Sequence, residues 1–177
     1  MDLSVVILNY NVRYLLESCI ESVVEALKGL SAEVILIDNA STDQSVIMVR
    51  EKYPAVKLLI NDSNLGFAKA NNLAIAQSTG QYILILNQDT IVNKSSIISA
   101  LNYIKSHKDC GGVGVKMVDG SGVFLKESLR GFPDMASSLY KLSGINRLFP
   151  KSKIFNHYYL GHLDPDKVQE VEVLAGA

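Results

Sequence analysis

The chain has 177 residues, of which 48% are hydrophobic, and its 17 lysines and arginines nearly balance 18 aspartates and glutamates. This length and composition predict one ordinary domain with a hydrophobic core, and the net charge of −1 gives no sign of a nucleic-acid partner. No basic leader and no long apolar run opens the chain. We therefore expect neither a signal peptide nor a membrane span, and we take a cytoplasmic protein as the default.

Short apolar runs that end in polar residues predict the strands of a sheet. The predicted strands cover residues 3–8, 33–38, 56–60, 82–86 and 113–117. The fourth run, Tyr82–Leu86, consists of five apolar residues and is typical of a strand buried on both faces. A hairpin turn is predicted at Asp119–Gly122.

Helical periodicity fills the intervals between these strands. The predicted helices cover residues 15–27, about 41–52, 67–76, about 96–104 and 137–142. Ser95 or Ser96 is the predicted cap of the fourth helix. Strands that alternate with helices predict right-handed β-α-β units and a mostly parallel sheet, so the fold class is α/β. Residues 146–166 give no regular pattern.

The two cysteines stand far apart, without the spacing of a metal site. Cys19 lies on the apolar face of the first predicted helix. We therefore expect it to be a buried free thiol and not a metal ligand.

Three of the predicted strands end in amide or carboxylate side chains. These ends are Asn9–Asn11, Asp38–Asn39 and Asn87–Asp89. A single polar strand end is common, and it is equally well explained as the start of a loop. In a parallel sheet, however, all three lie at the same edge, where open α/β sheets bind ligands.

The common nucleotide and hydrolase motifs are missing from the sequence. No GxGxxG follows the first strand, which argues against an ordinary dinucleotide fold. There is no GxxxxGK[ST] loop of a P-loop enzyme and no GxSxG turn of an α/β-hydrolase. Carboxylates, amides and backbone groups that face a polar ligand remain as the candidate chemistry.

Four short blocks follow one another along the chain. They read VVILNYN at residues 5–11, IDNASTD at 37–43, NLGFA at 64–68 with Asn71 and Asn72 behind it, and LNQDT at 86–90. Their order and spacing resemble glycosyltransferase family 2, and their wording is similar to that of its bacterial rhamnosyltransferase-like branch. The resemblance implies a GT-A (Rossmann-like) nucleotide-sugar-binding fold with a mostly parallel central sheet and flanking helices. It is dense over about residues 3–130 and thinner beyond.

The resemblance gives roles to the first two strand ends. Asp38 matches the family carboxylate that hydrogen-bonds the base of the nucleotide, and an acceptor there suits the ring N–H of uracil or thymine. Asn9 and Tyr10 would supply groups beside the same base. Asp38 also reads as a cap of the following helix, and the two roles can coexist.

The third block would serve the diphosphate. Gly66 lets the backbone approach closely, and Lys69 lies on the first turn of the following helix, where a cation and the helix N-terminus suit an anion. Lys69 equally reads as a solvated surface lysine. Asn71 and Asn72 would hold the loop or touch the nucleotide, and the sequence does not separate these roles.

The fourth block stands at the position of the family's DxD motif, whose last carboxylate binds the divalent cation that bridges the diphosphate. The resemblance therefore implies that Asp89 binds Mg²⁺ or Mn²⁺, which prefer oxygen ligands. Asn87 replaces the first acid, as is common in this branch, and remains a nucleotide-binding candidate. Gln88 departs from the usual Asn-Pro-Asp.

Two features lie beyond residue 126. Arg130 matches an Arg-x-Phe-Pro element and would face sugar or phosphate, or pair with a surface acid. A basic stretch over residues 141–153 reads as a solvated face. Its second reading is a peripheral contact with an anionic membrane that bears a lipid-linked acceptor.

An inverting transferase needs a general base for the acceptor hydroxyl. In the resembling family this acid follows a block that reads roughly Val-x-Gly-Ala, which looks like residues 171–177. We therefore expect a single GT-A domain over 1–177 that is truncated at its C-terminus, with the base beyond Ala177. Its nucleotide-sugar-binding half would cover about residues 1–118, and the start of an acceptor-side half residues 119–177.

The resulting expectation is an inverting glycosyltransferase, or its donor-binding half. It would transfer a sugar from a dTDP- or UDP-sugar, with dTDP-rhamnose as one candidate, to a polysaccharide or lipid-linked saccharide in bacterial cell-surface glycan synthesis. One alternative is a non-catalytic nucleotide-sugar-binding domain. The other is a sugar nucleotidyltransferase, which would need a glycine-rich basic loop that Asn9–Arg13 does not supply.

Overall fold

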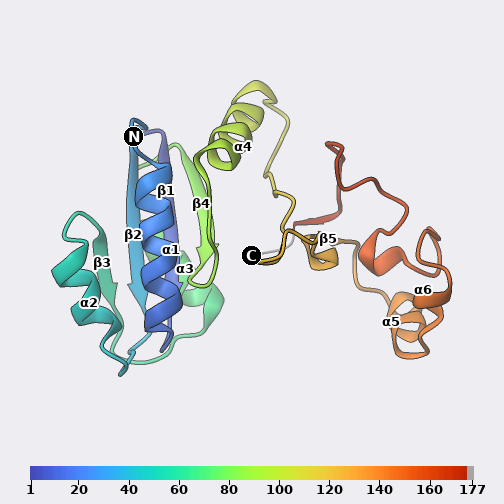
Figure 1. Cartoon of the computed structure of the whole chain (residues 1–177), viewed down its shortest axis with the longest axis horizontal. Helices are drawn as coiled ribbons and strands as arrows, with labels where there is room; N and C mark the ends of the chain where they lie inside the picture. Colours follow the sequence, from blue (N-terminus) through green and yellow to red (C-terminus); the bar gives the residue numbers. More distant parts are fainter. Residues whose placement is uncertain (175–177) are drawn as a thin grey trace. The chain divides into compact units, whose positions relative to one another are not determined.

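The structure is a computed structural model that describes residues 1–174. The chain forms two compact units, Met1–Asn102 and Tyr103–Ala177 (Figure 1). Within residues 1–174, no helix has both the length and the apolar character that a membrane crossing requires. The block predicted at residues 171–177 falls partly on residues 175–177, which lie outside the described residues.

The first unit is built on a four-stranded sheet in the order β3-β2-β1-β4 (Figure 1). Its strands are β1 (Leu3–Asn9), β2 (Ala32–Asp38), β3 (Lys57–Ile60) and β4 (Tyr82–Asn87). All neighbouring strands are parallel, which confirms the predicted α/β class and the parallel sheet.

The register of the strands brings their carboxyl ends to one edge of the sheet. Asn9 of β1 lies opposite Asp38 of β2, and Leu8 of β1 lies opposite Asn87 of β4. Ile60, the last residue of β3, lies opposite Asp38. The three polar strand ends predicted to meet therefore do so.

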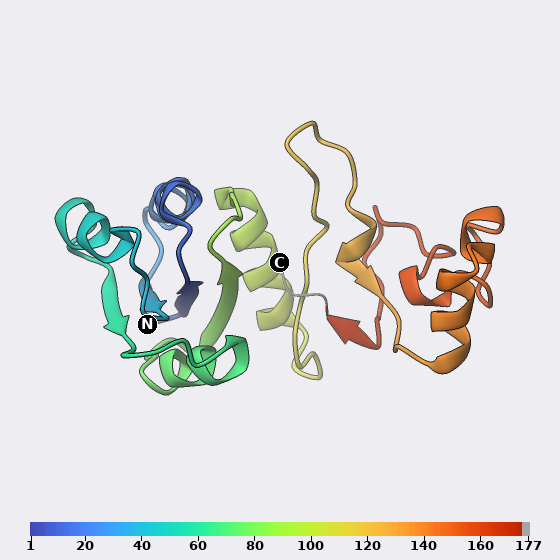
Figure 2. The same ribbon diagram turned by 90° about the horizontal axis from the view of Figure 1, so that it is seen from below.

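Helices cover both faces of this sheet. Helices α1 (Arg13–Ala26) and α2 (Ser45–Lys52) lie on one face, and α3 (Phe67–Ala76) lies on the other (Figure 2). Helix α4 (Lys94–Ser106) follows β4. It is capped by Asn93, whose Oδ1 accepts a hydrogen bond from Ser96 N at 2.8 Å, so the predicted serine cap was wrong.

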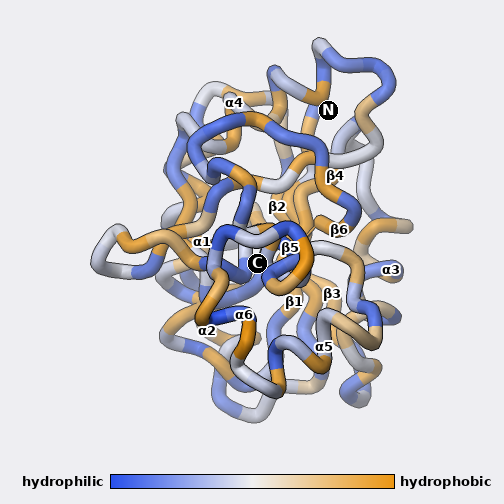
Figure 3. Tube along the Cα trace, turned by 90° about the vertical axis from the view of Figure 1, so that its right-hand side faces the viewer, coloured by the Kyte–Doolittle hydropathy of each residue, from blue (hydrophilic) through white to orange (hydrophobic). Residues whose placement is uncertain are grey.

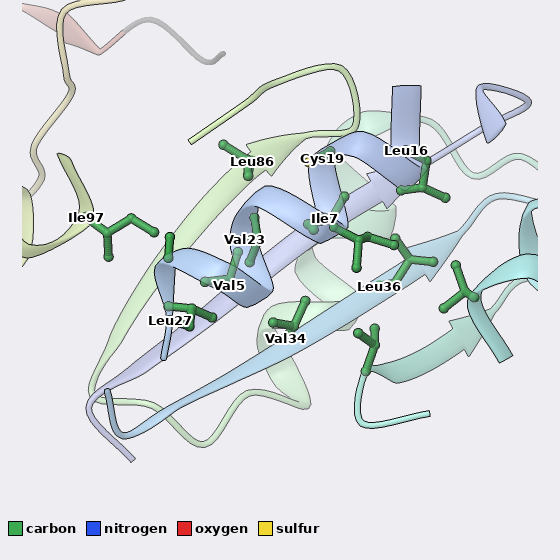
Figure 4. Packing of buried hydrophobic residues seen from close by; sticks show 14 of the residues in the cluster. Val5, Ile7, Leu16, Cys19, Val23, Leu27, Val34, Leu36, Leu86 and Ile97 are labelled. Carbon is green, nitrogen blue, oxygen red and sulfur yellow. The ribbon is translucent and has the colours of Figure 1, made fainter. Parts of the chain in front are cut away.

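The hydrophobic core forms around β1, because alternate side chains of this strand enter different layers. Val5 and Ile7 pack with α1 (Figure 4), whereas Val6 and Leu8 pack against α3. Cys19 of α1 is free and fully buried in the first layer, as predicted. Burial raises the pKa of its thiol to about 12.

Strand β4 differs from the prediction. It lies at the end of the sheet, and Ile83 and Ile85 are 40% and 43% exposed. Helix α3 packs mainly against β1 and β2, so one face of β4 stays open to solvent. The apolar run thus forms an edge strand, which its composition alone does not distinguish from a strand buried on both faces.

The second unit contains short elements. They are η1 (Lys126–Ser128), β5 (Leu129–Arg130), α5 (Met135–Leu142), α6 (Ile145–Leu148), η2 (His157–Tyr159) and β6 (Val173–Leu174). Strands β5 and β6 pair antiparallel. Helix α5 confirms the short helix predicted at residues 137–142.

The strand predicted at residues 113–117 is wrong, because these residues have no regular secondary structure. An isolated antiparallel bridge joins Val118 and Phe124. The hairpin turn between them is confirmed, since Gly122 N donates to the Asp119 carbonyl at 2.9 Å. A strand needs a neighbour for its backbone groups, and the glycines at positions 112 and 114 weaken the preference for strand.

Gly80 provides a test of the packing before β4. A Cβ at this position would come within 2.5 Å of Ser4 N and 2.6 Å of the Leu3 carbonyl carbon. Because these are backbone atoms that cannot rotate aside, we expect Gly80→Ala to lower the free energy of unfolding by about 1–3 kcal/mol in denaturant titrations. Gly111→Ala is the control, since its Cβ meets nothing within 4 Å. Equal stability of the two variants would contradict the prediction.

Glu33 provides a test of pH dependence. Its Oε1 accepts hydrogen bonds from Ser4 Oγ, Thr79 N and Thr79 Oγ1, each at 2.7 Å. Partial burial opposes ionisation, but the hydrogen bonds from Thr79 and Ser4 outweigh it and lower the pKa of the Glu33 carboxyl.

Because the pKa of Glu33 is lower in the folded state, its stabilisation is present above the unfolded-state pKa and is lost as the pH falls through the folded value. We therefore expect Glu33→Gln to be less stable than the wild type at pH 7, and the gap to close as the carboxyl protonates. Urea midpoints measured from pH 7 down to about pH 3 test this, a range that brackets the ordinary pKa of a glutamate. A gap of constant size across the range would rule out the assignment.

Candidate functional site

Asp38 organises the loops that follow β1 and β2. The residue is completely buried, and both of its side-chain oxygens accept hydrogen bonds within the first unit. Oδ1 accepts from Asn9 Nδ2 at 2.8 Å, and Oδ2 accepts from Ser41 N at 2.8 Å. Ser41 Oγ in turn accepts from Asn9 Nδ2 at 3.0 Å and from Asn11 N at 2.9 Å. The two strand ends and the two loops therefore form one hydrogen-bonded unit.

The alternative role of Asp38 as a helix cap is not what the structure shows. Ser41 lies ahead of α2, whose first residue is Ser45. Asp43 serves that helix, since its Oδ1 accepts from Ser45 N at 3.1 Å. Its Oδ2 accepts from Arg13 N, the first residue of α1, at 2.8 Å. One carboxylate thus accepts a hydrogen bond from a backbone N–H in the first turn of each of two helices, where negative charge is favoured.

The environment of Asp43 favours its ionised form. Partial burial raises the pKa of its carboxyl, but the hydrogen bonds from Ser45 and Arg13 outweigh this effect and lower it. Residues 39–43 are rich in helix N-cap residues in the sequence, and among them Asp43 accepts the hydrogen bond from the start of α2; its bond to the first residue of α1 was not predicted.

Three residues in these loops adopt left-handed backbone conformations. They are Asn11 (φ 53°), Ala40 (φ 63°) and Gln44 (φ 68°). Asparagine tolerates this region, whereas a residue such as alanine adopts it at a cost of about 1–2 kcal/mol. Asn11 and Gln44 also line a hollow of about 510 Å³ between residues 11–15 and 42–44. Strained backbone beside a hollow is typical of ligand sites.

A chain of amide side chains extends from β2 to the start of α3. Asn39 is 2% exposed, its Oδ1 accepts from Asn61 Nδ2 at 2.8 Å, and its Nδ2 donates to Asn64 Oδ1 at 3.1 Å. Asn64 Oδ1 also accepts from Gly66 N at 2.9 Å. Gly66 has φ 75°, and α3 begins directly after it without a side-chain cap. The amide chain thus fixes the approach to the first turn of α3, a role that the sequence did not assign to Asn39 or Asn61.

On α3 the structure separates the two asparagines. Asn71 is 3% exposed, and its Nδ2 donates to the Phe67 carbonyl at 2.9 Å, so it braces the helix. Asn72 and Lys69 are exposed. Asn72 and Lys69 are therefore accessible to a ligand, whereas Asn71 is not.

Helix α1 supports the loop that carries Asp89. Asn87 is half-buried, and Asp89 lies exposed in the turn that follows β4. Cys19 Sγ donates to the Asn87 carbonyl at 3.5 Å, and Ser22 Oγ accepts from Val92 N at 3.1 Å. Two side chains one helical turn apart thus hold both ends of this loop, which the apolar-face interpretation of Cys19 did not reveal.

Among the described residues, the side chains alone do not form a metal site, and a bound substrate would have to supply further ligands. In residues 1–174 no group of three His, Cys, Asp or Glu side chains could hold an ion. Mg²⁺ is, however, often held by one or two carboxylates together with substrate phosphates. Asp89 is exposed and can supply one such oxygen ligand beside a bound diphosphate.

The predicted site residues divide into surface and buried groups. Tyr10, Gly66, Lys69, Asn72 and Asp89 are exposed, Asn87 is half-buried, and Asn9 and Asp38 are buried against each other. All of them belong to the first unit, and their roles in binding stay predictions. Arg130 lies in β5 of the second unit, where its register partner is Val173. No ion pair to Arg130 occurs among the described residues, and its buried Nε has no hydrogen-bond partner there.

The family model described as "Glycosyl transferase family 2" matches residues 4–161. The chain belongs to glycosyltransferase family 2. This establishes the family that the four blocks resemble, whereas the rhamnosyltransferase-like branch stays a prediction.

Curated relatives include a poly(ribitol-phosphate) glycosyltransferase and a teichoic acid biosynthesis protein. The poly(ribitol-phosphate) β-N-acetylglucosaminyltransferase TarS of Staphylococcus aureus (strain Mu50) is 32% identical over 130 residues, which cover 70% of this chain and 22% of TarS. The minor teichoic acid biosynthesis protein GgaB of Bacillus subtilis is 31% identical over 112 residues, which cover 61% of this chain and 12% of GgaB. The chain thus spans less than a quarter of either relative.

Solved structures confirm the GT-A fold. TarS residues 1–349 of S. aureus match with a TM-score of 0.56 and 25% identity over 77% of this chain and 40% of that one. The mannosyltransferase PcManGT of Pyrobaculum calidifontis, in complex with GDP-Man and Mn²⁺, matches with a TM-score of 0.54 and 26% identity. That match covers 66% of this chain and 35% of PcManGT.

The buried position of Asp38 gives a stability prediction. Asp38→Ala removes the acceptor of Ser41 N and one of the two acceptors of Asn9 Nδ2, so we expect the free energy of unfolding to fall by about 1–3 kcal/mol in the absence of nucleotide. Asp62→Ala, which truncates an exposed acid in the turn after β3, should change it by less than about 0.5 kcal/mol. Urea denaturation of both variants measures the difference. An Asp38→Ala variant as stable as the wild type would show that the hydrogen-bonded unit is dispensable for the fold.

Proposed function

We propose that this chain is the donor-binding part of an inverting glycosyltransferase that uses a dTDP- or UDP-sugar. The observation that carries the proposal is the meeting of Asn9, Asp38 and Asn87 at the carboxyl edge of a parallel sheet in a family 2 chain. Ligands of open α/β sheets bind at this edge. Support comes from the neighbours, since TarS has been crystallised with UDP and with UDP-GlcNAc.

The nucleoside would bind over the loops after β1 and β2. Tyr10 and Asn11 are exposed there, above the buried pair of Asn9 and Asp38. Asp38 already accepts two hydrogen bonds and is inaccessible, so a direct bond from the base to its carboxylate requires the Ser41 loop to open. Without such an opening, Asp38 contributes by holding the loop in shape.

The diphosphate would bind at the first turn of α3 and at the turn after β4. Helix α3 begins without a side-chain cap, so its first N–H groups and Lys69 can face an anion. Asp89 would hold Mg²⁺ or Mn²⁺, and the cation would neutralise charge on the departing nucleoside diphosphate. Arg130 remains a candidate for a contact to sugar or phosphate.

The reaction would be a single displacement at the anomeric carbon. The acceptor hydroxyl attacks as a general base removes its proton, and the nucleoside diphosphate leaves from the opposite face, so the configuration inverts. The proposal assigns no general base among the described residues.

The names of two relatives support the acceptor class that we propose. The name of GgaB refers to minor teichoic acid biosynthesis, and the name of TarS refers to poly(ribitol-phosphate). We propose a polysaccharide or lipid-linked saccharide of the bacterial cell surface as acceptor, glycosylated at the cytoplasmic face of the membrane. A dTDP-rhamnose donor remains a hypothesis for titration.

Calorimetry of UDP, dTDP and GDP, each with and without Mn²⁺, tests the proposal. We expect a pyrimidine nucleoside diphosphate to bind more tightly with Mn²⁺. Asp89→Ala should weaken the Mn²⁺-supported binding about tenfold or more, because it removes the carboxylate that holds the cation, and should change metal-free binding little. Asp62→Ala is the matched control.

The possible results separate the candidates. If no nucleotide binds, the donor-binding role is wrong for this chain. If binding with Mn²⁺ is unchanged in Asp89→Ala, the metal role of this residue is wrong, whereas the nucleotide site stands.

A further inference from the structure

Helix α5 presents its apolar side to solvent. Met135, Leu139 and Leu142 are 91%, 63% and 86% exposed, and their spacing of four and three residues places them on one face. The buried residue of this helix is Ser137. A helix that packs its apolar face inward would show the reverse arrangement.

A capping box closes the start of α5, and a ring contact marks its inner side. Asp134 Oδ1 accepts from Ser137 N at 2.6 Å, and Ser137 Oγ accepts from Asp134 N at 3.2 Å, which completes a capping box. On the inner side, the ring of Tyr140 packs edge-on against Phe155 at 5.2 Å. The outward position of the leucines is thus built into the packing of the second unit.

Further large apolar side chains are exposed after α5. Leu148, Phe149 and Ile154 are 75%, 53% and 66% exposed, and the Phe149 ring lies 5.3 Å from that of Phe155. We call these three residues, together with Met135, Leu139 and Leu142, the α5–α6 surface. In Figure 3 hydrophobic and hydrophilic residues alternate along α5 and α6. Exposed large apolar residues grouped on neighbouring elements are a feature of interaction sites.

Within residues 135–163 the charge has a single sign, whereas Asp134 caps the N-terminus of α5. Residues 135–163 contain no aspartate or glutamate and carry four exposed cations, Lys141, Arg147, Lys151 and Lys153. No ion pair in the described part of the chain involves these four. Lys141 Nζ lies 4.5 Å from the Tyr158 ring centroid. Because this ring is uncharged, the contact does not neutralise the charge of the lysine. Because the whole chain has a net charge of −1, this cationic segment stands in an otherwise acidic protein.

We propose that the α5–α6 surface docks on an anionic lipid bilayer, with α5 lying in the plane of the interface. An amphipathic helix that inserts its apolar face between lipid headgroups and places lysines and arginines beside it is the usual form of such contacts. The cations then face anionic headgroups, to which basic residues near a bilayer are attracted. A second copy of this chain fits less well, because it would bring four further cations against these four.

The docking goes beyond the proposed sugar transfer and does not depend on it. It would place a transferase beside a lipid-linked acceptor, but vesicle binding is measurable without nucleotide. Failure of the nucleotide titration and failure of vesicle binding are therefore separate results.

Co-sedimentation of the full chain with vesicles tests the proposal. We expect binding to vesicles of phosphatidylcholine with phosphatidylglycerol, much weaker binding to phosphatidylcholine alone, and a decline as salt screens the charges. Leu139→Ser/Leu142→Ser and Lys151→Glu/Lys153→Glu should each lower the partition coefficient about tenfold or more. Ile47→Ser, which alters an exposed apolar residue of α2, and Lys28→Glu/Lys108→Glu are the matched controls and should bind as the wild type does.

A fluorescent reporter locates the contact, since the chain contains no tryptophan. Leu142→Trp should show a blue-shifted emission on addition of anionic vesicles, whereas Ile47→Trp should show none. Circular dichroism checks that every variant is folded.

Three results would overturn the proposal. The first is no binding of the folded wild type to anionic vesicles. The second is equal binding by the surface variants and their controls, and the third is an emission shift at Ile47→Trp but not at Leu142→Trp. A concentration-dependent dimer that Leu139→Ser/Leu142→Ser abolishes, without vesicle binding, would assign the surface to a second copy instead.

Discussion

The contact between Asn9 and Asp38 is the constraint on which the site depends. A carboxylate without solvent access is tolerated only when its oxygens have hydrogen-bond partners. Asn9 and the backbone of Ser41 supply them, at 2.8 Å each. This requirement ties the ends of β1 and β2 together and shapes both loops that follow. The exposed residues Tyr10 and Asn11 of the candidate donor site belong to a loop that this buried pair holds in place.

The same principle extends across the whole edge of the sheet. Asp43 satisfies the first turns of α1 and α2, the amide chain through Asn39 reaches α3, and Cys19 supports the loop beyond β4. Buried or half-buried polar side chains thus hold the loops, and exposed ones remain available to a ligand. Such a separation of roles favours the binding of an anion, because donors in loops that are already held in place bind it without a cost for ordering the loops.

The two units differ in where their apolar residues lie. In the first, β1 is buried on both faces and forms a continuous core with α1 and α3. In the second, α5 turns a serine inward and leucines outward. The first arrangement stabilises the fold, whereas the second leaves apolar area available for a partner, and the cations beside it favour an anionic one.

The sequence by itself determined the parallel α/β sheet, the polar strand ends, the buried Cys19 and the family, because strand and helix periodicity and the four blocks are local patterns. It did not determine that β4 is an edge strand, that residues 113–117 form no strand, or that Asp38 bonds inward to Asn9. It also did not predict the bond from Asp43 to the start of α1 or the place of Asn61 in the amide chain. These features depend on which neighbour each element meets. A run of isoleucines and leucines reads the same whether one face or two are covered, and a carboxylate reads the same whether its partner is a ligand or an asparagine 29 residues away. Only the tertiary structure supplies those neighbours, because burial and hydrogen bonding are decided between segments that are distant in the chain.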